Sequence, residues 1–174
     1  MIKYFLFIVI SFISLSLYAQ EEDAGRIAPN FVLEDLEGNL VELNQEIGEG
    51  PILLSFWATW CKPCLEELVE FQKLYNLYKD KGFKMLAIST DDERTVAKVK
   101  PFVKTKNYNF PVLLDTNSDV ARIYYARAVP FSVLINPSGM IVYSHLGYMR
   151  GDELQVKSKV IEMIGGKNIS SPGE

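Results

Sequence analysis

Apolar and polar residues follow two different periods along the chain, and each period predicts a kind of element. Positions 30–45 alternate on both sides of Glu37-Gly38-Asn39, which predicts a β-hairpin whose turn uses Gly and Asn. The run 52–57, ILLSFW, is apolar except for one serine, as is typical of a strand covered on both faces. A buried central strand is therefore expected at 52–57.

The segment that follows the buried strand has helical spacing. Apolar or buried-type residues recur in steps of four, three, four and three, at Cys64, Leu68, Phe71, Tyr75 and Tyr78. Acidic residues gather near its start and lysines near its end, as the helix dipole prefers, and Gly82 supplies a stop signal. We predict one long amphipathic helix that ends close to Gly82.

Strand and helix patterns alternate along the rest of the chain. They predict a strand at 84–89, a helix at 93–106 that Pro101 kinks or divides, a strand at 110–114, a short helix at 118–124, strands at 131–135 and 140–144, and a helix at 152–164. This order indicates an α/β protein: a three-layer α/β/α sandwich with a central mixed sheet and an N-terminal β-hairpin.

The first nineteen residues have the pattern of an export signal. Lys3 supplies the positive start, residues 4–17 are mainly apolar, and Ala19 offers a small residue before a cleavage point. If it stays uncleaved, the same segment is an N-terminal anchor. Either way we expect the protein to work outside the cytoplasm. The expected organisation is a signal peptide or anchor at 1–19, a linker at 20–28, one domain at 29–165 and a flexible tail at 166–174.

Composition narrows the class of function. The chain has 174 residues, is 48% hydrophobic and 23% charged, and carries a net charge of -4. It contains no run of Lys and Arg, so no nucleic-acid partner is expected. Its two cysteines, Cys61 and Cys64, are too few for a multi-bridge disulfide framework, so a chemical role is favoured for them.

The two cysteines lie at the junction between the predicted buried strand and the predicted long helix. If the helix starts there, Cys61 is its N-cap, Lys62 and Pro63 are its first residues, and Cys64 is the third. Free N–H groups, the helix dipole and the Lys62 cation all lower the pKa of a thiol at the N-cap. We therefore expect Cys61 to be the attacking nucleophile and Cys64, on the core-facing side, to be the shielded partner.

Glu67 lies three residues beyond Cys64 on the same side of the predicted helix. A partly buried carboxylate there can take the proton that Cys64 must lose. Spacing alone favours the other interpretation, in which Glu67 is an exposed acid that stabilises the helix start. Nearby, Trp57 is expected in the core, and Trp60 is expected at the apolar rim of the site.

Two other interpretations of the cysteines remain open. A structural zinc site needs about four ligands, and the chain offers only His145 as a further soft ligand. A purely structural disulfide is the other alternative, because exported proteins contain such bridges. We expect no metal and no cofactor.

Three segments together resemble the thioredoxin superfamily: WCKPC after an apolar strand, AVPFSVLINPSGMIV downstream, and APNFVLEDLEGNLVEL at the start of the domain. With the exported N-terminus they resemble its TlpA, ResA and CcmG-like thiol–disulfide oxidoreductases, which carry an AhpC/TSA-redoxin-like domain. The resemblance implies a thioredoxin fold with an inserted helix–strand element between about residues 91 and 114. It also implies a location in the bacterial periplasm, or on a membrane facing outward.

The resemblance also implies roles for single residues. Cys61 and Cys64 match the redox pair, and Glu67 matches the glutamate of a CxxCxxE pattern. Pro130 matches the family's cis-proline, which places the backbone of Val129 beside the active-site sulfur. The residues expected to contact substrate are Trp60, Lys62, Pro63, Val129 and Pro130.

The chain also departs from the family pattern. Ser55 stands where cytoplasmic thioredoxins have a buried aspartate, and Phe131 follows the proline where a small hydroxyl residue is usual. Arg127 and Ala128 occupy a stretch where glycine is common. Because the last three residues belong to the substrate-facing loop, the resemblance is least informative about substrate choice.

The expected function is reduction of disulfides in extracytoplasmic proteins. The resemblance implies disulfide-containing protein substrates, a membrane or periplasmic electron donor, and contact with the membrane only through an uncleaved N-terminus. Cytochrome c maturation is the best-known task of this branch. The alternatives are a thioredoxin-fold binding or chaperone module without turnover, and a thiol peroxidase. Peroxidases of this fold place their cysteine in a PxxxTxxC pattern, which neither cysteine of this chain has.

Overall fold

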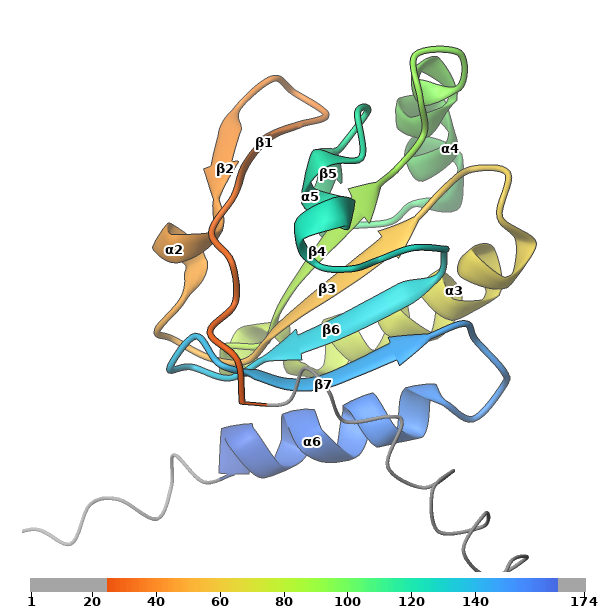
Figure 1. The fold of residues 1–174 in the computed structure, drawn as a ribbon. Coiled ribbons are helices and arrows are strands. Elements are labelled where there is room, and N and C mark those ends of the chain that lie inside the picture. Colours follow the sequence, from red (N-terminus) through yellow and green to blue (C-terminus); the bar gives the residue numbers. More distant parts are fainter. Residues whose placement is uncertain (1–24, 166–174) are drawn as a thin grey trace, which may run out of the picture.

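Seven strands form one mixed sheet in the computed structural model, which describes residues 25–165 (Figure 1). The expected signal peptide (1–19) and tail (166–174) lie outside the described residues. The strands are β1 (Val32–Asp35), β2 (Leu40–Glu42), β3 (Ile52–Trp57), β4 (Lys84–Ser89), β5 (Val112–Leu114), β6 (Phe131–Ile135) and β7 (Ile141–Leu146). Their order is β2-β1-β5-β4-β3-β6-β7. The pairs β3–β4 and β4–β5 are parallel and the other pairs are antiparallel.

Helices cover both faces of this sheet (Figure 1). They are α2 (Leu43–Glu46), α3 (Lys62–Tyr78), α4 (Val99–Lys106), α5 (Asp119–Ile123) and α6 (Glu153–Gly165), with 3₁₀ turns at Lys79–Lys81 and Val96–Lys98. The buried side chains of α3, α4 and α6 share one core cluster, whereas those of α2 and α5 belong to a second cluster. The predicted three-layer α/β/α sandwich with a central mixed sheet is confirmed.

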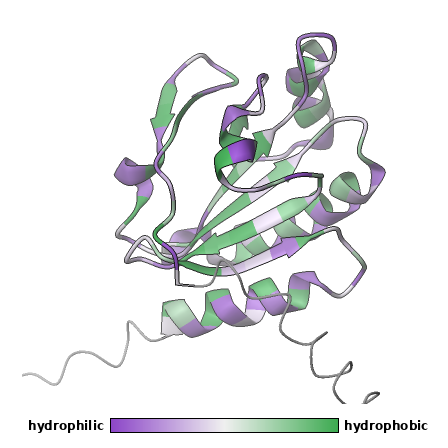
Figure 2. Cartoon of the chain, in the orientation of Figure 1, coloured by the Kyte–Doolittle hydropathy of each residue, from purple (hydrophilic) through white to green (hydrophobic). Residues whose placement is uncertain are grey.

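Strand β3 runs through the middle of the molecule and contributes side chains to both core clusters. Leu53 and Trp57 pack into the cluster on the α3 side, whereas Leu54 and Phe56 pack into the cluster on the α5 side. All six residues of β3 are buried, so the apolar run correctly predicted a strand covered on both faces. Figure 2 shows the hydrophobic residues concentrated along the central strands.

The predicted hairpin ends earlier than expected. Strands β1 and β2 pair around the Glu37-Gly38-Asn39 turn, but residues 43–46 form α2 rather than a continuation of the strand. The N–H of Asn44 donates to Oδ1 of Asn30, at 3.0 Å, which diverts the backbone from strand pairing. The side chain of Leu43 is fully buried. The alternation of neighbouring residues cannot reveal this long-range hydrogen bond or the burial of Leu43.

The helix predicted at 93–106 begins later. Residues 96–98 form a 3₁₀ turn, and α4 then starts at Val99. Pro101 is the third residue of α4, where a backbone N–H has no partner inside the helix, so the proline starts the helix instead of kinking it. With β5 it forms the helix–strand element that the resemblance implied.

Residues 25–28, which the sequence placed at the end of a linker, contact the sheet. Ile27 forms an antiparallel bridge with Met140, and the N–H of Ala28 donates to the carbonyl of Gly139. Ala28 is buried in the core cluster on the α5 side. Among residues 25–165, no helix is both long and apolar enough to cross a membrane.

Candidate active site

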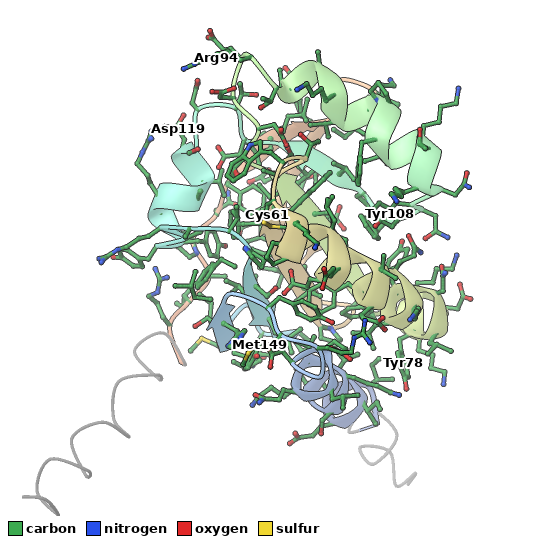
Figure 3. The ribbon with its side chains drawn as sticks, turned by 90° about the vertical axis from the view of Figure 1, so that its right-hand side faces the viewer. Cys61, Tyr78, Arg94, Tyr108, Asp119 and Met149 are labelled. Atoms are coloured by element: carbon green, nitrogen blue, oxygen red, sulfur yellow. A yellow bond between two sulfur atoms is a disulfide. The ribbon has the colours of Figure 1, made fainter. Side chains whose placement is uncertain are left out.

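Cys61 caps the N-terminus of α3, immediately after the end of β3 (Figure 3). Its sulfur accepts a hydrogen bond from the N–H of Cys64, with N and Sγ 3.3 Å apart. Lys62 and Pro63 are the first two residues of the helix, and the proline has no N–H to leave unpaired there. The predicted cap position is confirmed. It places the Cys61 sulfur at the positive end of the helix dipole.

The two sulfur atoms are joined in a disulfide, with an S–S distance of 2.04 Å. Cys64 is fully buried in the core cluster on the α3 side, whereas 6% of Cys61 is exposed. An incoming thiol or disulfide therefore reaches Cys61 first. The shielded position expected for Cys64 follows from its place on the core-facing side of α3.

The loop before β6 brings a second backbone segment to this sulfur. The peptide bond between Val129 and Pro130 is cis, as the resemblance implied. The carbonyl oxygen of Val129 lies 3.6 Å from Sγ of Cys61, although the two residues are 68 positions apart. Pairing of β6 with β3 produces this approach, because Phe131 lies opposite Phe56 in the register.

Glu67 is buried one turn beyond Cys64, with only 2% of its surface exposed. Its Oε1 accepts a hydrogen bond of 3.0 Å from the hydroxyl of Ser132, and its Oε2 accepts one of 3.3 Å from Ser55. The two serines lie opposite each other on β6 and β3, beneath α3. Interpreting Glu67 as an exposed helix-start acid was therefore wrong.

Burial raises the pKa of Glu67 to about 8. The hydrogen bonds from Ser132 and Ser55 act in the opposite direction, and the negative charge of Asp152 adds to the rise. The carboxyl group is therefore largely protonated at neutral pH. A carboxyl group with such a pKa gains and loses its proton within the pH range in which most proteins work.

Asp91 is a buried carboxylate that holds the loop in front of Cys61. Its carboxylate accepts the N–H of Thr59 at 2.8 Å, the hydroxyl of Thr59 at 2.5 Å and the hydroxyl of Ser89 at 2.9 Å. The sequence analysis missed this residue. Its signal was topological, because Asp91 follows β4 as Cys61 follows β3, and the carboxyl ends of parallel neighbours meet at one sheet edge.

Ser132 was also missed, although a signal existed for it. Ser55 and Ser132 are the polar residues within the two apolar runs ILLSFW and FSVLI, and a hydroxyl buried in a strand needs a partner. The sequence shows both hydroxyls but not the α3 carboxyl that they share.

The other expected contact residues lie around Cys61 on the surface. Trp60 is 65% exposed, and Lys62 and Pro63 are also exposed. In the view of Figure 3, Cys61 is seen between Asp119 of α5 above it and Met149 below it. Trp60, Lys62 and Pro63, which flank Cys61 in the chain, form an accessible surface next to it.

His145 lies on β7, and its Nε2 is 3.2 Å from Oδ2 of Asp152. Its ring also stacks on the ring of Tyr143. These contacts are those of an ordinary histidine that pairs with a neighbouring carboxylate and a neighbouring ring. Among residues 25–165, no group of three His, Cys, Asp or Glu side chains is arranged to hold a metal ion.

Comparisons with known proteins identify the family of this chain. Residues 24–144 match the AhpC/TSA family. The chain is 37% identical over 146 residues to the thiol-disulfide oxidoreductase ResA of Bacillus cereus, covering 83% of each chain. It is 38% identical over 125 residues to ResA of Bacillus subtilis, covering 72% of this chain and 68% of that one.

A solved structure of a thioredoxin domain has the same fold as this chain. The thioredoxin domain of a thiol-disulfide oxidoreductase from Bacteroides vulgatus superposes with a TM-score of 0.66 at 31% identity. The match covers 79% of this chain and 97% of that domain. The likeness thus extends over nearly all of the described residues.

Proposed function

Since the chain belongs to the AhpC/TSA family, and within it to the thiol–disulfide oxidoreductases, we propose that it reduces disulfides in proteins outside the cytoplasm. One observation carries the proposal: the Cys61–Cys64 disulfide caps α3, and the buried carboxyl of Glu67 lies one turn further along the same helix. This arrangement provides an attacking sulfur, a resolving sulfur and a proton carrier.

The first step uses Cys61. In the dithiol form, the helix N-terminus and the N–H of Cys64 stabilise a thiolate at the Cys61 position. This thiolate attacks one sulfur of a substrate disulfide. A new S–S bond forms to Cys61, the substrate S–S bond breaks, and the second substrate sulfur leaves as a thiolate that takes a proton from water.

The second step uses Cys64 and Glu67. The Cys64 thiol passes its proton to the Glu67 carboxylate, and its sulfur then attacks Sγ of Cys61. The Cys61–Cys64 disulfide forms, and the remaining substrate sulfur leaves as a thiolate. The substrate gains two electrons and the enzyme loses two. The buried position of Cys64 makes an internal base useful, because water has little access to that thiol.

An electron donor with a dithiol restores the enzyme. One donor thiolate attacks Sγ of Cys61, the Cys61–Cys64 bond breaks, and Cys64 leaves as a thiolate. The second donor thiolate then attacks the donor sulfur of this mixed disulfide, so that Cys61 leaves as a thiolate and the donor is oxidised to a disulfide. Glu67 is largely protonated at neutral pH, with its pKa raised to about 8 by burial, so it can return the proton to Cys64. The same carboxyl thus serves both half-reactions.

Two features support the reducing direction and the location. Pro63 stands between the cysteines, as in the reducing members that this sequence resembles, and residues 1–19 have the pattern of an export signal or anchor. The proposed substrates are disulfide-containing proteins, the haem-binding cysteines of cytochrome c among them. The proposed donor is a membrane or periplasmic dithiol protein.

A redox titration together with a turnover assay tests the proposal. Catalytic reduction of a protein disulfide is expected for the wild type and is expected to disappear in Cys61→Ser. A binding module without turnover predicts no catalysis in either protein. The reducing direction predicts a potential near the roughly -270 mV of thioredoxin, whereas a value near -120 mV would contradict it.

A further inference from the structure

The loop that reaches Cys61 carries a surface hollow beside the substrate position. The hollow measures about 310 Å³ and is lined by Ala121, Arg122, Tyr125, Ala126 and Arg127. Its alanines have small side chains that leave space for a ligand, while its arginines and tyrosine provide cationic and aromatic surface. A water molecule occupies about 30 Å³, so the hollow has room for a side chain.

The hollow adjoins the reacting sulfur along the chain. Arg127 is two residues before Val129, whose carbonyl oxygen lies 3.6 Å from Sγ of Cys61. Two residues span at most about 7 Å of chain. A substrate segment that lies along Val129 therefore places its neighbouring side chains near Arg127.

The backbone holds Tyr125 in an unusual conformation with its ring outward. Its φ is 57°, in the left-handed region that favours glycine, and 59% of the residue is exposed. The N–H groups of Tyr125 and Ala126 donate to the carbonyls of Arg122 and Ala121, which closes the end of α5. The guanidinium of Arg26 lies 5.2 Å from the ring centroid of Tyr125.

The charges of the hollow differ from those of the whole chain. The chain has 22 acidic residues, 18 Lys and Arg, and a net charge of -4, yet two arginines line this hollow. Arg122 pairs with Asp119, but Arg127 forms no ion pair within residues 25–165 and is exposed. The charge left uncompensated beside the site is therefore positive.

We propose that this hollow selects protein substrates that carry an acidic side chain about two residues from the cysteine attacked by Cys61. The acidic group binds Arg127, and its aliphatic portion lies against the ring of Tyr125. This inference rests on the proposed function and names the chemistry of its substrates. Charge pairs at such a rim act on substrate choice and association rate more than on total affinity.

Matched peptides test this selection. Each of three peptides carries one cysteine that is joined through a disulfide bond to neutral 2-thiopyridine. The peptides differ only at the positions two residues before and two residues after this cysteine, which are both Glu, both Gln or both Lys. Pre-reduced enzyme is mixed with each peptide, and the single-turnover rate of thiopyridine release is measured. For the wild type we expect the Glu peptide to react about tenfold faster than the Lys peptide at low salt, and this ratio to fall towards one in 0.5 M NaCl.

Substitutions locate the effect. Arg127→Glu is expected to bring the Glu/Lys ratio to one or below, whereas Arg127→Lys retains it. Lys81→Glu, the same change of charge at the far end of α3 from Cys61, is expected to leave the ratio unchanged. Tyr125→Gly suits the left-handed backbone but removes the ring, so a lower rate for the Glu peptide in a protein of equal or greater stability supports the binding role.

Either of two results overturns the selection: a Glu/Lys ratio within twofold of one for the wild type, or a ratio that Arg127→Glu leaves unchanged. The Gln peptide separates this failure from a failure of the proposed function. If the wild type reacts with the Gln peptide but shows no preference by charge, only the selection is wrong. If no peptide reacts, the proposed function is wrong as well.

Discussion

The hydroxyl of Ser132, on β6, donates a hydrogen bond of 3.0 Å to the carboxyl of Glu67, on α3. Ser55 on β3 makes the corresponding contact with the other carboxyl oxygen. Two neutral hydroxyls replace only part of the hydration that a buried carboxylate loses, so burial dominates and raises the pKa of Glu67 to about 8. Strand pairing thus places the proposed proton carrier, a carboxyl whose pKa is raised to about 8, one turn of α3 beyond Cys64.

Replacing Glu67 by Gln is expected to slow the release of reduced product. The base form of Glu67 takes the Cys64 proton, so the wild-type rate should rise with pH up to about 8. Glu67→Gln should lose this rise and be about 10²-fold slower at pH 8. The measurement is single-turnover decay of a Cys61 mixed disulfide between pH 6 and 9. Glu66→Gln, an exposed acid on the same turn, is the control, and an identical profile in both variants would contradict the role.

The stability of the oxidised protein should depend on the same carboxyl. Between pH 4.5 and about 8, folded Glu67 keeps a proton that the unfolded chain releases. The free energy of unfolding should therefore fall as pH rises through this window, by about 1.4 kcal/mol per pH unit in its middle. Urea unfolding at several pH values should show this slope in the wild type and not in Glu67→Gln. If the free energy of unfolding has the same slope against pH in the wild type and in Glu67→Gln, the raised pKa of Glu67 is wrong.

Removing one cysteine at a time should separate their roles. Cys64→Ser keeps Cys61, the more accessible of the two cysteines, but has nothing to resolve the adduct, so mixed disulfides with substrate proteins should accumulate. Cys61→Ser should trap little, because Cys64 is fully buried. Non-reducing electrophoresis followed by mass spectrometry of the captured partners measures both. Equal trapping by the two variants would exclude Cys61 as the attacking residue.

Asp91→Ala should destabilise the loop that leads to Cys61. It removes the acceptor for both Thr59 donors and for the Ser89 hydroxyl, at a fully buried position. We expect a loss of about 2–4 kcal/mol in the free energy of unfolding, and a smaller loss in Asp91→Asn, which keeps one acceptor oxygen. Urea unfolding gives the values, with the exposed Asp80→Ala as the control. If Asp91→Ala and Asp80→Ala cost the same, the loop does not depend on Asp91.

Much of the fold could be predicted because its signals are local. The continuous apolar run of β3, the helical spacing of α3 and the Glu37-Gly38-Asn39 turn each depend on neighbouring residues. The hairpin end was placed wrongly because a distant contact decided it, and the start of α4 was placed too early because residues 96–98 form a 3₁₀ turn before it. Asn30 draws the N–H of Asn44 away from the strand, and no periodicity reports such a bond.

The sequence by itself determined the cysteine pair and its place at a helix N-terminus, and the resemblance to the thioredoxin superfamily indicated the chemical class. Only the tertiary structure decided that Glu67 is buried between Ser55 and Ser132, and that Asp91 holds Thr59. The reason is physical: capping and spacing act within one turn of chain, whereas the pKa of a carboxyl depends on which distant strands exclude water from it. The sequence identified the two cysteines, and the packing of α3 on β3 and β6 set the environment of the proposed proton carrier, Glu67.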